Sequence, residues 1–247
     1  MSNAFVTGGS RGIGRSIVLR YVSEGWGVAF TYSSNKEAAD RTLEMAREIR
    51  PDARVQAYQL NLSDEDAIDK VCEQAIDDFE NITAVVNNAA ILKDNAAALM
   101  SNEEWKDVVS VNLTAPFLVS RNFLLHFLSN RKGRLIHVSS LAAYGSSGQV
   151  NYAASKAGLQ GMSLTIAKEY GKKGITSNIV TVGYVPTAMT EENMNKQLQE
   201  YWLKHCPARR VGTPEEIASA VYYLSSDEAS FISGEDLRIS AGLTYAP

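Results

Sequence analysis

The chain has 247 residues, of which 45% are hydrophobic and 21% charged, with a formal net charge of -4. These values describe a soluble globular protein long enough to bury a sizeable core. The mildly acidic balance gives no reason to expect nucleic acid or an anionic membrane surface as a partner.

The N-terminal stretch predicts the first half of a dinucleotide-binding βαβ unit. A short buried strand over residues 4–7 enters a glycine-rich turn, and an amphipathic helix follows until Gly25 stops it. Glycines let the backbone approach a pyrophosphate closely, and the helix N-terminus offers it unpaired N–H groups and a positive dipole. We therefore expect cofactor contacts from the turn residues Gly8, Ser10, Arg11, Gly12, Ile13 and Gly14.

The end of the second predicted strand, residues 28–32, bears on the choice of cofactor. An NAD site usually places a carboxylate there for the ribose hydroxyls, but this chain continues with Ser33 and Ser34 and no acid. Arg11 can instead reach a 2′-phosphate, with the two serines as hydroxyl donors. This favours NADPH. Ser34 has a second interpretation, because Ser34-x-x-Glu37 fits a capping box for the next helix.

The middle of the chain continues the alternation of strands and helices. A helix is expected to begin at the box Ser63-x-x-Asp66. Asn87 and Asn88 end the fourth strand, where paired asparagines either contact a cofactor or brace neighbouring backbone. The two strands and the helix between them are predicted over residues 55–60, 84–87 and 63–79.

The helix that begins at the capping box Ser101-x-x-Glu104 carries a polar residue, Asn112, among apolar neighbours. Asparagine is a poor helix former, and a buried one needs hydrogen-bond partners. Asn112 therefore either satisfies a neighbouring strand or organises water in a site. The strand that follows is apolar until it ends in the pair Ser139-Ser140.

Tyr152 and Lys156 are four residues apart in a predicted helix that runs to about Tyr170, so both side chains lie on one helical face. An ammonium beside a phenol favours the phenolate. We therefore expect the pKa of Tyr152 to fall towards working pH and its hydroxyl to serve as a proton donor. This pattern alone occurs by chance in many proteins, and the other motifs give it weight.

The C-terminal third completes the predicted fold. The segment 188–210 lacks a clear strand, and we expect it to form a substrate lid. Thr213-Pro214-Glu215-Glu216 supplies an N-cap, a first-position proline and first-turn acids. Because strands and helices alternate throughout, we expect one domain, residues 1–247, built on a Rossmann-type doubly wound parallel sheet of about seven strands with helices on both faces. The last two strands are predicted over residues 176–182 and 237–240.

Cysteine usage and hydropathy indicate the compartment. Cys72, predicted in the core, and Cys206, predicted in a loop, match no disulfide or metal spacing, which favours a reducing environment and no metal site. No apolar run reaches about 18 residues, so no membrane span is expected. The first strand begins almost at the N-terminus, which leaves no room for a signal peptide. We expect a cytoplasmic protein.

Taken together, the motifs resemble those of the short-chain dehydrogenase/reductase family, and the resemblance covers essentially the whole chain. Its subgroup of 3-oxoacyl-[acyl-carrier-protein] reductases is the most similar, through the stretches 88–95, 212–217 and 224–234. The motifs that carry the family resemblance are Thr7-Gly-x-x-x-Gly12-x-Gly14, Asn87-Asn88-Ala89, Asn112, Ser139-Ser140 and Tyr152-x-x-x-Lys156.

The resemblance implies a role for each residue of this set. Tyr152 would donate a proton to the substrate oxygen, and Lys156 would bind the nicotinamide ribose and lower the pKa of Tyr152. Ser140 would hold the carbonyl oxygen, and Asn112 a water that links Lys156 to solvent. Further cofactor contacts are implied for Ser33, Asn61, Leu62, Asn88, Val185 and Thr187.

The choice of serine depends on how the spacing is counted. The usual family distance from the tyrosine names Ser139, whereas the register of the strand names Ser140. Strand register is rigid and loops tolerate deletions, so Ser140 is preferred. Asn61 stands where the family has an aspartate. This and similar departures suggest a specialised member, such as a ketoreductase of secondary metabolism.

The resemblance implies an NADPH-dependent ketoreductase that acts on 3-oxoacyl groups of acyl carrier protein, in fatty-acid or polyketide-type biosynthesis, and that assembles as a homotetramer. Arg131 and Lys173 match positions that dock the acidic carrier, and we expect them to steer it to the pocket mouth. The alternatives are an NAD(P)-dependent short-chain alcohol or sugar dehydrogenase and a catalytically idle dinucleotide-binding regulatory protein.

Overall fold

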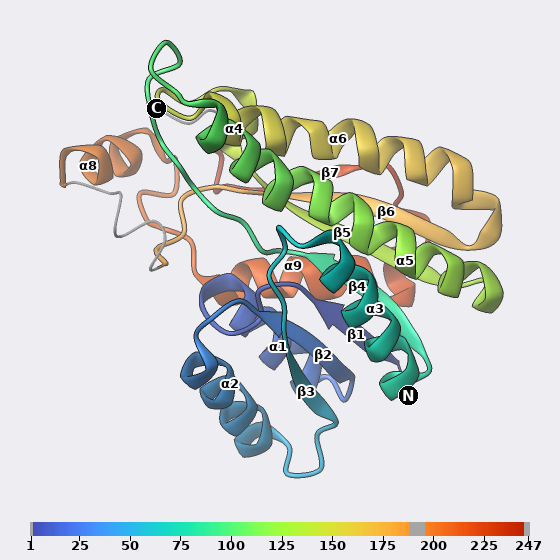
Figure 1. The fold of residues 1–247 in the computed structure, drawn as a ribbon. Helices are drawn as coiled ribbons and strands as arrows, with labels where there is room; N and C mark the ends of the chain where they lie inside the picture. The colour runs from blue at the N-terminus through green and yellow to red at the C-terminus, as the bar shows by residue number, and fades with distance from the viewer. Residues whose placement is uncertain (1, 188–195, 245–247) are drawn as a thin grey trace.

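The computed structural model of the protein describes residues 2–187 and 196–244 (Figure 1). A seven-stranded sheet with the strand order β3-β2-β1-β4-β5-β6-β7 forms its centre, and all neighbouring strands are parallel. This confirms the predicted doubly wound sheet. The strands are β1 (Asn3–Val6), β2 (Gly27–Tyr32), β3 (Val55–Gln59), β4 (Ile82–Asn87), β5 (Gly133–Ser140), β6 (Ile175–Val182) and β7 (Asp236–Ile239).

Helices connect the strands and cover both faces of the sheet (Figure 1). The α-helices are α1 (Gly12–Ser23), α2 (Lys36–Ile49), α3 (Glu65–Phe79), α4 (Asn102–Val109), α5 (Ala115–Asn130), α6 (Val150–Tyr170), α8 (Lys196–His205) and α9 (Pro214–Ser225). A π-helical turn, η1 (Ser110–Thr114), joins α4 to α5. Short 3-10 turns are η2 (Leu141–Tyr144), η3 (Gly171–Lys173) and η4 (Asp227–Ala229).

The inner strands are apolar along their length because helices bury both faces of the sheet. Every residue of β1 and β6 is buried. One face packs against α1 and α9 through side chains such as Ile17 and Val221. The other face packs against α3, α5 and α6 through Phe79, Phe123 and Ile166. The two layers of core cover the faces of the sheet and leave the carboxyl ends of its strands open for a site. We call this end of the sheet its carboxyl edge, and the opposite end its amino edge.

The direction in which the sheet grows reverses beside β1. The first three strands extend towards one edge, and after α3 the chain returns to place β4 on the other side of β1. In open parallel sheets, ligands bind outside the carboxyl ends of the strands at such a switch point. The topology therefore places a candidate site at the carboxyl ends of β1 and β4.

Two helices begin one residue later than the predicted capping boxes. Asn35, and not Ser34, caps α2, where its Oδ1 accepts a hydrogen bond from the Ala38 N–H at 2.8 Å. Asp64, and not Ser63, caps α3 in the same way at 3.0 Å. Asparagine and aspartate are at least as effective as serine at this position, which explains both shifts. Ser34 does not cap the helix and instead lines a pocket.

The other two predicted helix starts are confirmed. Ser101 and Glu104 form a reciprocal capping box at α4, and Thr213 and Glu216 form one at α9. Pro214 occupies the first turn of α9, where its missing N–H needs no partner.

A continuous helix over Asn102–Asn130 comprises α4, η1 and α5. By its length, and by the mean hydropathy of 1.3 in its most apolar 18-residue window, this helix passes a test for membrane spans that buried helices of globular proteins also pass. However, 56% of its most apolar window is buried inside the protein. Its own side chains Phe123 and Phe127 lie in the core, so the helix acts as a structural layer of the fold.

Candidate active site

A pocket of 650 Å³ lies at the carboxyl ends of the strands, at the switch point. Every residue predicted to contact the cofactor lines it: Gly8, Ser10, Arg11, Gly12, Ile13, Gly14, Ser33, Asn61, Leu62, Asn88, Tyr152, Lys156, Val185 and Thr187. Ser140 lines the same pocket, whereas Asn112 is fully buried behind it. The fold thus brings residues from distant parts of the sequence together around one pocket.

The turn between β1 and α1 depends on glycine at particular positions. Gly8 and Gly12 have φ angles of 71° and 53°, in the left-handed region. A Cβ on Gly14 would overlap the carbonyl oxygen of Gly8, so the first turn of α1 packs directly on the loop. No side chain in the described part of the protein caps α1. Its unpaired N–H groups and positive dipole therefore face the pocket, an arrangement that binds phosphate.

A clamp of hydrogen bonds joins the end of β1 to the end of β4. Thr7 Oγ1 accepts from the backbone N–H groups of Asn88 at 3.0 Å and Ala89 at 3.1 Å. Asn88 Nδ2 donates in return to the carbonyl groups of Thr7 at 3.0 Å and Gly8 at 3.3 Å. Asn87 is buried and donates to a hydroxyl of α5 at 3.1 Å. Asn88 therefore braces the backbone and also lines the pocket, whereas Asn87 ties β4 to α5.

Arg15 is a bracing residue that the sequence did not reveal. Its Nε and Nη2 donate to the carbonyl oxygen of Ser10 at 3.1 and 2.6 Å. Nε also donates to Oγ1 of Thr42 at 3.0 Å, and Thr42 lies in α2. Arg15 thus ties the glycine-rich turn to the next helix. This contact depends on the tertiary placement of Thr42, which local spacing does not indicate.

The charge of the pocket bears on which nicotinamide cofactor fits. Arg11 and Lys156 are its cationic lining residues, and among residues 2–187 and 196–244 no aspartate or glutamate lines it. Ser33 and Ser34, at the end of β2, line the same pocket. A guanidinium with hydroxyl groups and without a carboxylate suits a phosphate better than a ribose hydroxyl.

The two candidate serines at the end of β5 have different partners. Ser139 is buried, and its Oγ donates to the carbonyl oxygen of Lys156 at 3.3 Å. Ser140 Oγ accepts from the Ala142 N–H at 3.2 Å. A side-chain hydrogen bond also joins the Ser140 hydroxyl and the phenol of Tyr152. Successive side chains of a strand point to opposite faces, and here Ser140 is the one beside Tyr152.

Tyr152 and Lys156 lie on one face of α6, with Lys156 Nζ 5.6 Å from the centre of the Tyr152 ring. Lys156 is buried and donates to the carbonyl oxygen of Val138 at 2.8 Å. Burial lowers the pKa of Lys156 to about 8.

The pKa of Tyr152 does not fall as predicted from the sequence. Burial raises it to about 12, and the hydrogen bond with Ser140 only partly opposes this effect. Tyr152 is therefore a phenol throughout the physiological pH range.

Asn112 lies in the π-helical turn η1 and holds the wall of the pocket. Its Oδ1 accepts from the Ile91 N–H at 2.9 Å, and its Nδ2 donates to the Ile91 carbonyl oxygen at 3.0 Å. Ile91 lines the pocket. Of the two alternatives left open by the sequence, these contacts match satisfaction of neighbouring backbone, although Ile91 belongs to a loop and not to a strand. The π-turn, which the sequence did not predict, is a frequent feature of functional sites.

Asn151 is a second positioning residue that the motifs did not indicate. It is fully buried, and its Nδ2 donates to the carbonyl groups of Lys93 at 2.9 Å and Glu104 at 3.3 Å. Its Oδ1 accepts from the Tyr152 N–H at 2.7 Å. These bonds fix the first turn of α6 against α4 and the loop after β4. The available signal was a polar residue directly before Tyr152.

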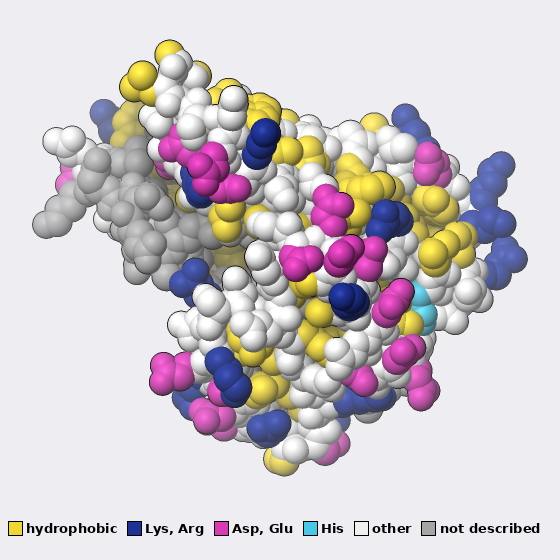
Figure 2. Space-filling model, viewed as in Figure 1, with side chains coloured by type: hydrophobic (Ala, Val, Ile, Leu, Met, Phe, Trp, Pro, Cys, Tyr) yellow, Lys and Arg dark blue, Asp and Glu magenta, His cyan; other side chains and the backbone are white. Residues whose placement is uncertain are grey.

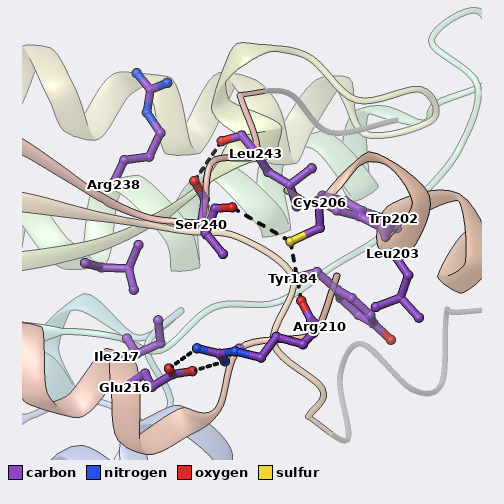
Figure 3. Close-up of a pocket in the computed structure, with 13 residues that line it drawn as sticks. Tyr184, Trp202, Leu203, Cys206, Arg210, Glu216, Ile217, Arg238, Ser240 and Leu243 are labelled. Atoms are coloured by element: carbon purple, nitrogen blue, oxygen red, sulfur yellow. Dashed lines mark hydrogen bonds and ion pairs between the residues drawn. The ribbon is translucent and has the colours of Figure 1, made fainter. Parts of the chain in front are cut away.

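A second cavity, of 270 Å³, lies behind the segment that follows β6 (Figure 3). Val185 and Thr187 line the first pocket, whereas Tyr184 lines this second cavity. The ring of Tyr184 packs on Trp202 of α8, with ring centres 5.7 Å apart. The described part of the predicted lid, residues 196–210, is thereby attached to the segment that borders the first pocket, and residues 188–195 lie outside the described residues.

Cys206 closes the second cavity beside the end of α8. The predicted loop thiol is buried, and its Sγ–H donates to the carbonyl oxygen of Arg210 at 3.4 Å and to that of Ala241 at 3.9 Å. Figure 3 shows the sulfur between the two segments. Arg210 forms an ion pair with Glu216 at 2.6 Å. These contacts anchor the C-terminal side of the segment 196–210.

The two cations predicted to dock a carrier lie far from the pocket. Arg131 follows α5 and Lys173 lies in η3, each just before a strand, so both are at the amino edge of the sheet. The eight residues of β5 separate this edge from the carboxyl edge by about 25 Å. Figure 2 shows Lys and Arg side chains gathered where α5 and α6 end. Neither cation lines the pocket of its own chain, and their role in steering a carrier stays a prediction.

Comparison with known proteins places these features in one family. The family model described as Enoyl-(Acyl carrier protein) reductase matches residues 8–244. The 3-oxoacyl-[acyl-carrier-protein] reductase FabG of Salmonella typhimurium is 38% identical over 241 residues, which cover 97% of this chain and 96% of that protein. The protein of the same name from Staphylococcus aureus is 36% identical over 242 residues, covering 98% and 97%.

A solved structure of another reductase is also similar to this chain. The crystal structure of levodione reductase matches with a TM-score of 0.94 and 29% identity, covering 98% of this chain and 96% of that chain. The chain belongs to the short-chain dehydrogenase/reductase family, whose members use a nicotinamide dinucleotide.

Proposed function

We propose that this short-chain dehydrogenase/reductase is an NADPH-dependent ketoreductase. Its substrate would be a 3-oxoacyl thioester on acyl carrier protein, reduced to the 3-hydroxyacyl form in fatty-acid or polyketide-type biosynthesis. The observation that carries this proposal is the meeting, in one pocket, of a phosphate-binding glycine turn with Ser140, Tyr152 and Lys156. The names of the relatives support the carrier-bound substrate.

The pocket residues fit a nicotinamide dinucleotide that carries a 2′-phosphate. The close approach of Gly14 to the Gly8 carbonyl packs the first turn of α1 on the glycine-rich turn, and the unpaired N–H groups of that first turn would bind the pyrophosphate. Arg11 and Ser33 would hold the 2′-phosphate, because no described carboxylate competes for it in the pocket. The remaining contacts would come from Asn61, Leu62, Asn88, Val185 and Thr187.

The side chains supply the proton and the orientation for carbonyl reduction. Bound NADPH supplies a hydride to the carbonyl carbon. Ser140 holds the carbonyl oxygen by a hydrogen bond. Tyr152 is protonated because its pKa is raised, and it donates its proton to that oxygen as negative charge develops there. Lys156, an ammonium at neutral pH, binds the nicotinamide ribose and stabilises the phenolate left on Tyr152. Hydride and proton together account for the 3-hydroxyacyl product.

Asn112 would act one step behind these groups. We propose that Asn112, besides binding Ile91, holds a water molecule that links Lys156 to solvent, so that a proton can return to Tyr152. Its burial in a π-turn and its two hydrogen bonds to Ile91 support a fixed position behind the pocket wall.

The assembly and the docking of the carrier belong to the same proposal. Because Arg131 and Lys173 lie at the amino edge of the sheet, they would serve the pocket of a neighbouring subunit in a homotetramer. Phe117, Leu125 and Leu164 support such an assembly, because α5 and α6 leave them 50%, 71% and 43% exposed. The enzyme would work in the cytoplasm, and residues 188–210 would form the lid over its substrate.

A panel of substrates at saturating NADPH tests the proposed function. We expect the highest initial rate of NADPH oxidation with a short 3-oxoacyl thioester, compared with levodione and with simple ketones. Reduction of NADP+ or NAD+ by alcohols or sugars, without turnover of the thioester, would instead indicate a short-chain alcohol or sugar dehydrogenase. Binding of NADPH without turnover of any substrate would indicate an idle regulatory protein.

A further inference from the structure

A third cavity, of 440 Å³, lies at the amino edge of the sheet, opposite the edge that carries the pocket. The first residues of β5 and β6 form one side of it, and the turn after α9 forms the other. Its charged lining residues in the described part of the chain are Arg131, Lys132, Arg134 and Asp227. The cavity thus has three cations and one carboxylate, and therefore an excess of positive charge.

Two buried polar groups in this cavity lack partners. Arg134 and Thr176 are cross-strand neighbours in β5 and β6, and both line the cavity with exposed fractions of only 5% and 6%. Arg134 Nε and Thr176 Oγ1 have no hydrogen-bond partner among the residues that the structure describes. Buried polar groups in folded proteins are almost always satisfied, so an unpaired donor next to an unpaired hydroxyl points to a bound polar ligand.

The remaining contacts of Arg134 hold its guanidinium in place without neutralising the site. Nη1 donates to two backbone carbonyl groups, each at 3.1 Å, and Nη2 reaches Asp227 at 3.4 Å. Lys132 Nζ binds the same carboxylate at 2.8 Å. Asp227 is therefore shared, and Arg131 at the rim adds a further cation.

An apolar side chain stands beside these cations. Phe231 lines the same cavity and is fully exposed to solvent. Exposed phenylalanine next to fixed donors suits a ligand that has an anionic end and an apolar body.

We propose that this cavity binds a phosphate group, with Arg134 Nε–H, the Thr176 hydroxyl and the Lys132 ammonium as donors to its oxygens. If the phosphate is an ester, Phe231 receives the apolar part. Phosphate suits the site because it has several strong acceptor oxygens and up to two negative charges, which match converging donors and cations. This site goes beyond the proposed reduction, since none of these four residues takes part in it.

Calorimetric titration with inorganic phosphate and with phenyl phosphate, at fixed ionic strength, tests this proposal. The enzyme is saturated with NADP+ and the titration is repeated with Arg11→Ala, so that binding in the pocket at the other edge is excluded. We expect saturable binding of about one equivalent per chain, unchanged in Arg11→Ala, because Arg11 lies in a different cavity.

Two matched variants identify the site. Thr176→Val removes one donor with little change in shape and should weaken phosphate binding about tenfold, as should Lys132→Gln. Thr83→Val is the control, because the Thr83 hydroxyl is also buried in the sheet without a described partner but does not line this cavity. Thr83→Val should bind phosphate like the wild type, and all three variants should retain ketone reduction.

The two probes distinguish the sources of the phosphate. Tighter binding of phenyl phosphate that is lost in Phe231→Ala would identify an organic phosphate ester as the ligand. Equal affinity for both probes would identify free phosphate, and either result supports the site. Absence of saturable binding to the wild type, or equal binding by Thr176→Val and Thr83→Val, would overturn the proposal whether or not the enzyme reduces ketones.

Discussion

At the scale of single residues, burial sets the protonation states on which the chemistry depends. It keeps Tyr152 protonated, with a pKa of about 12, and it brings the pKa of Lys156 down to about 8. The phenol is thus available as an acid at neutral pH, and the ammonium is close to losing its proton. Both shifts follow from removing these groups from water, which disfavours the charged form of each.

Tyr152→Phe separates chemistry from binding. The variant loses the proton donor but keeps the ring, so we expect turnover of the ketone to fall on the order of 10²- to 10⁴-fold. The affinity for NADPH, measured by fluorescence titration, should change little. Retention of most of the activity would contradict the role of Tyr152 as the acid.

The pH dependence of kcat/KM for NADPH reports on Lys156 in the enzyme without cofactor. Because the pKa of Lys156 is about 8, we expect this value to decline as the pH rises through 8, when the ammonium is lost. No separate loss from Tyr152 is expected below about pH 11, since its pKa is about 12. A plateau that extends to pH 10 would contradict the burial of Lys156.

The same shift has an opposite effect on folding. The pKa of Lys156 in the folded protein lies below its ordinary value of 10.5, so the unfolded chain binds more protons between pH 8 and 10.5. The contribution of this group to the free energy of unfolding therefore rises with pH in that window. Activity and stability should thus diverge above pH 8, which thermal unfolding at each pH can check.

At the scale of elements, the clamp between β1 and β4 holds the glycine-rich turn where a cofactor needs it. Thr7→Val keeps the shape but leaves the N–H groups of Asn88 and Ala89 without their acceptor. We expect a loss of about 1–3 kcal/mol in the free energy of unfolding, together with weaker binding of NADPH. Chemical denaturation and cofactor titration measure the two effects.

Thr83→Val again provides the control for this element. Its buried hydroxyl has no partner among the described residues, so replacing it with a methyl group should lower neither the free energy of unfolding nor the affinity for NADPH. Equal destabilisation by Thr7→Val and Thr83→Val would mean that the clamp contributes nothing specific.

Elements were predictable from the sequence where local chemistry determines them. The apolar strands, the glycine-rich turn and the helix starts at Ser101 and Thr213 are local patterns, and the structure confirms them. The sequence pattern places the caps of α2 and α3 one residue early, because serine stands next to asparagine or aspartate at both positions and all three residues cap well. The bracing by Arg15 and Asn151 and the pKa of Tyr152 could not be predicted, because they depend on burial and on contacts between distant segments.

At the scale of the whole molecule, the position of the basic edge limits how a carrier could dock. Arg131 and Lys173 lie about 25 Å from the pocket of their own chain. The family resemblance suggested the residues, but only the topology shows at which end of the sheet they lie. Carrier docking at these cations therefore requires a neighbouring subunit to present its pocket.

Reversing both charges tests this requirement. Arg131→Glu with Lys173→Glu should lower kcat/KM for a carrier-bound substrate on the order of tenfold while sparing a small free ketone, because only the acidic carrier senses the edge. Leu125→Asp, designed to break the proposed contact between subunits, should reduce the mass in sedimentation and the carrier-specific activity together. Equal losses on both substrates would exclude a docking role.

The most direct test is the ratio of kcat/KM with NADPH to that with NADH, measured with a short 3-oxoacyl thioester in the wild type and in Arg11→Ala. We expect the wild type to prefer NADPH by about 10- to 100-fold or more, since a charge-assisted contact with a phosphate is worth about 1.5–3 kcal/mol. Arg11→Ala should lose most of this preference through weaker use of NADPH. Preference for NADH, or a ratio that Arg11→Ala leaves unchanged, would contradict the assignment of the carboxylate-free pocket to NADPH.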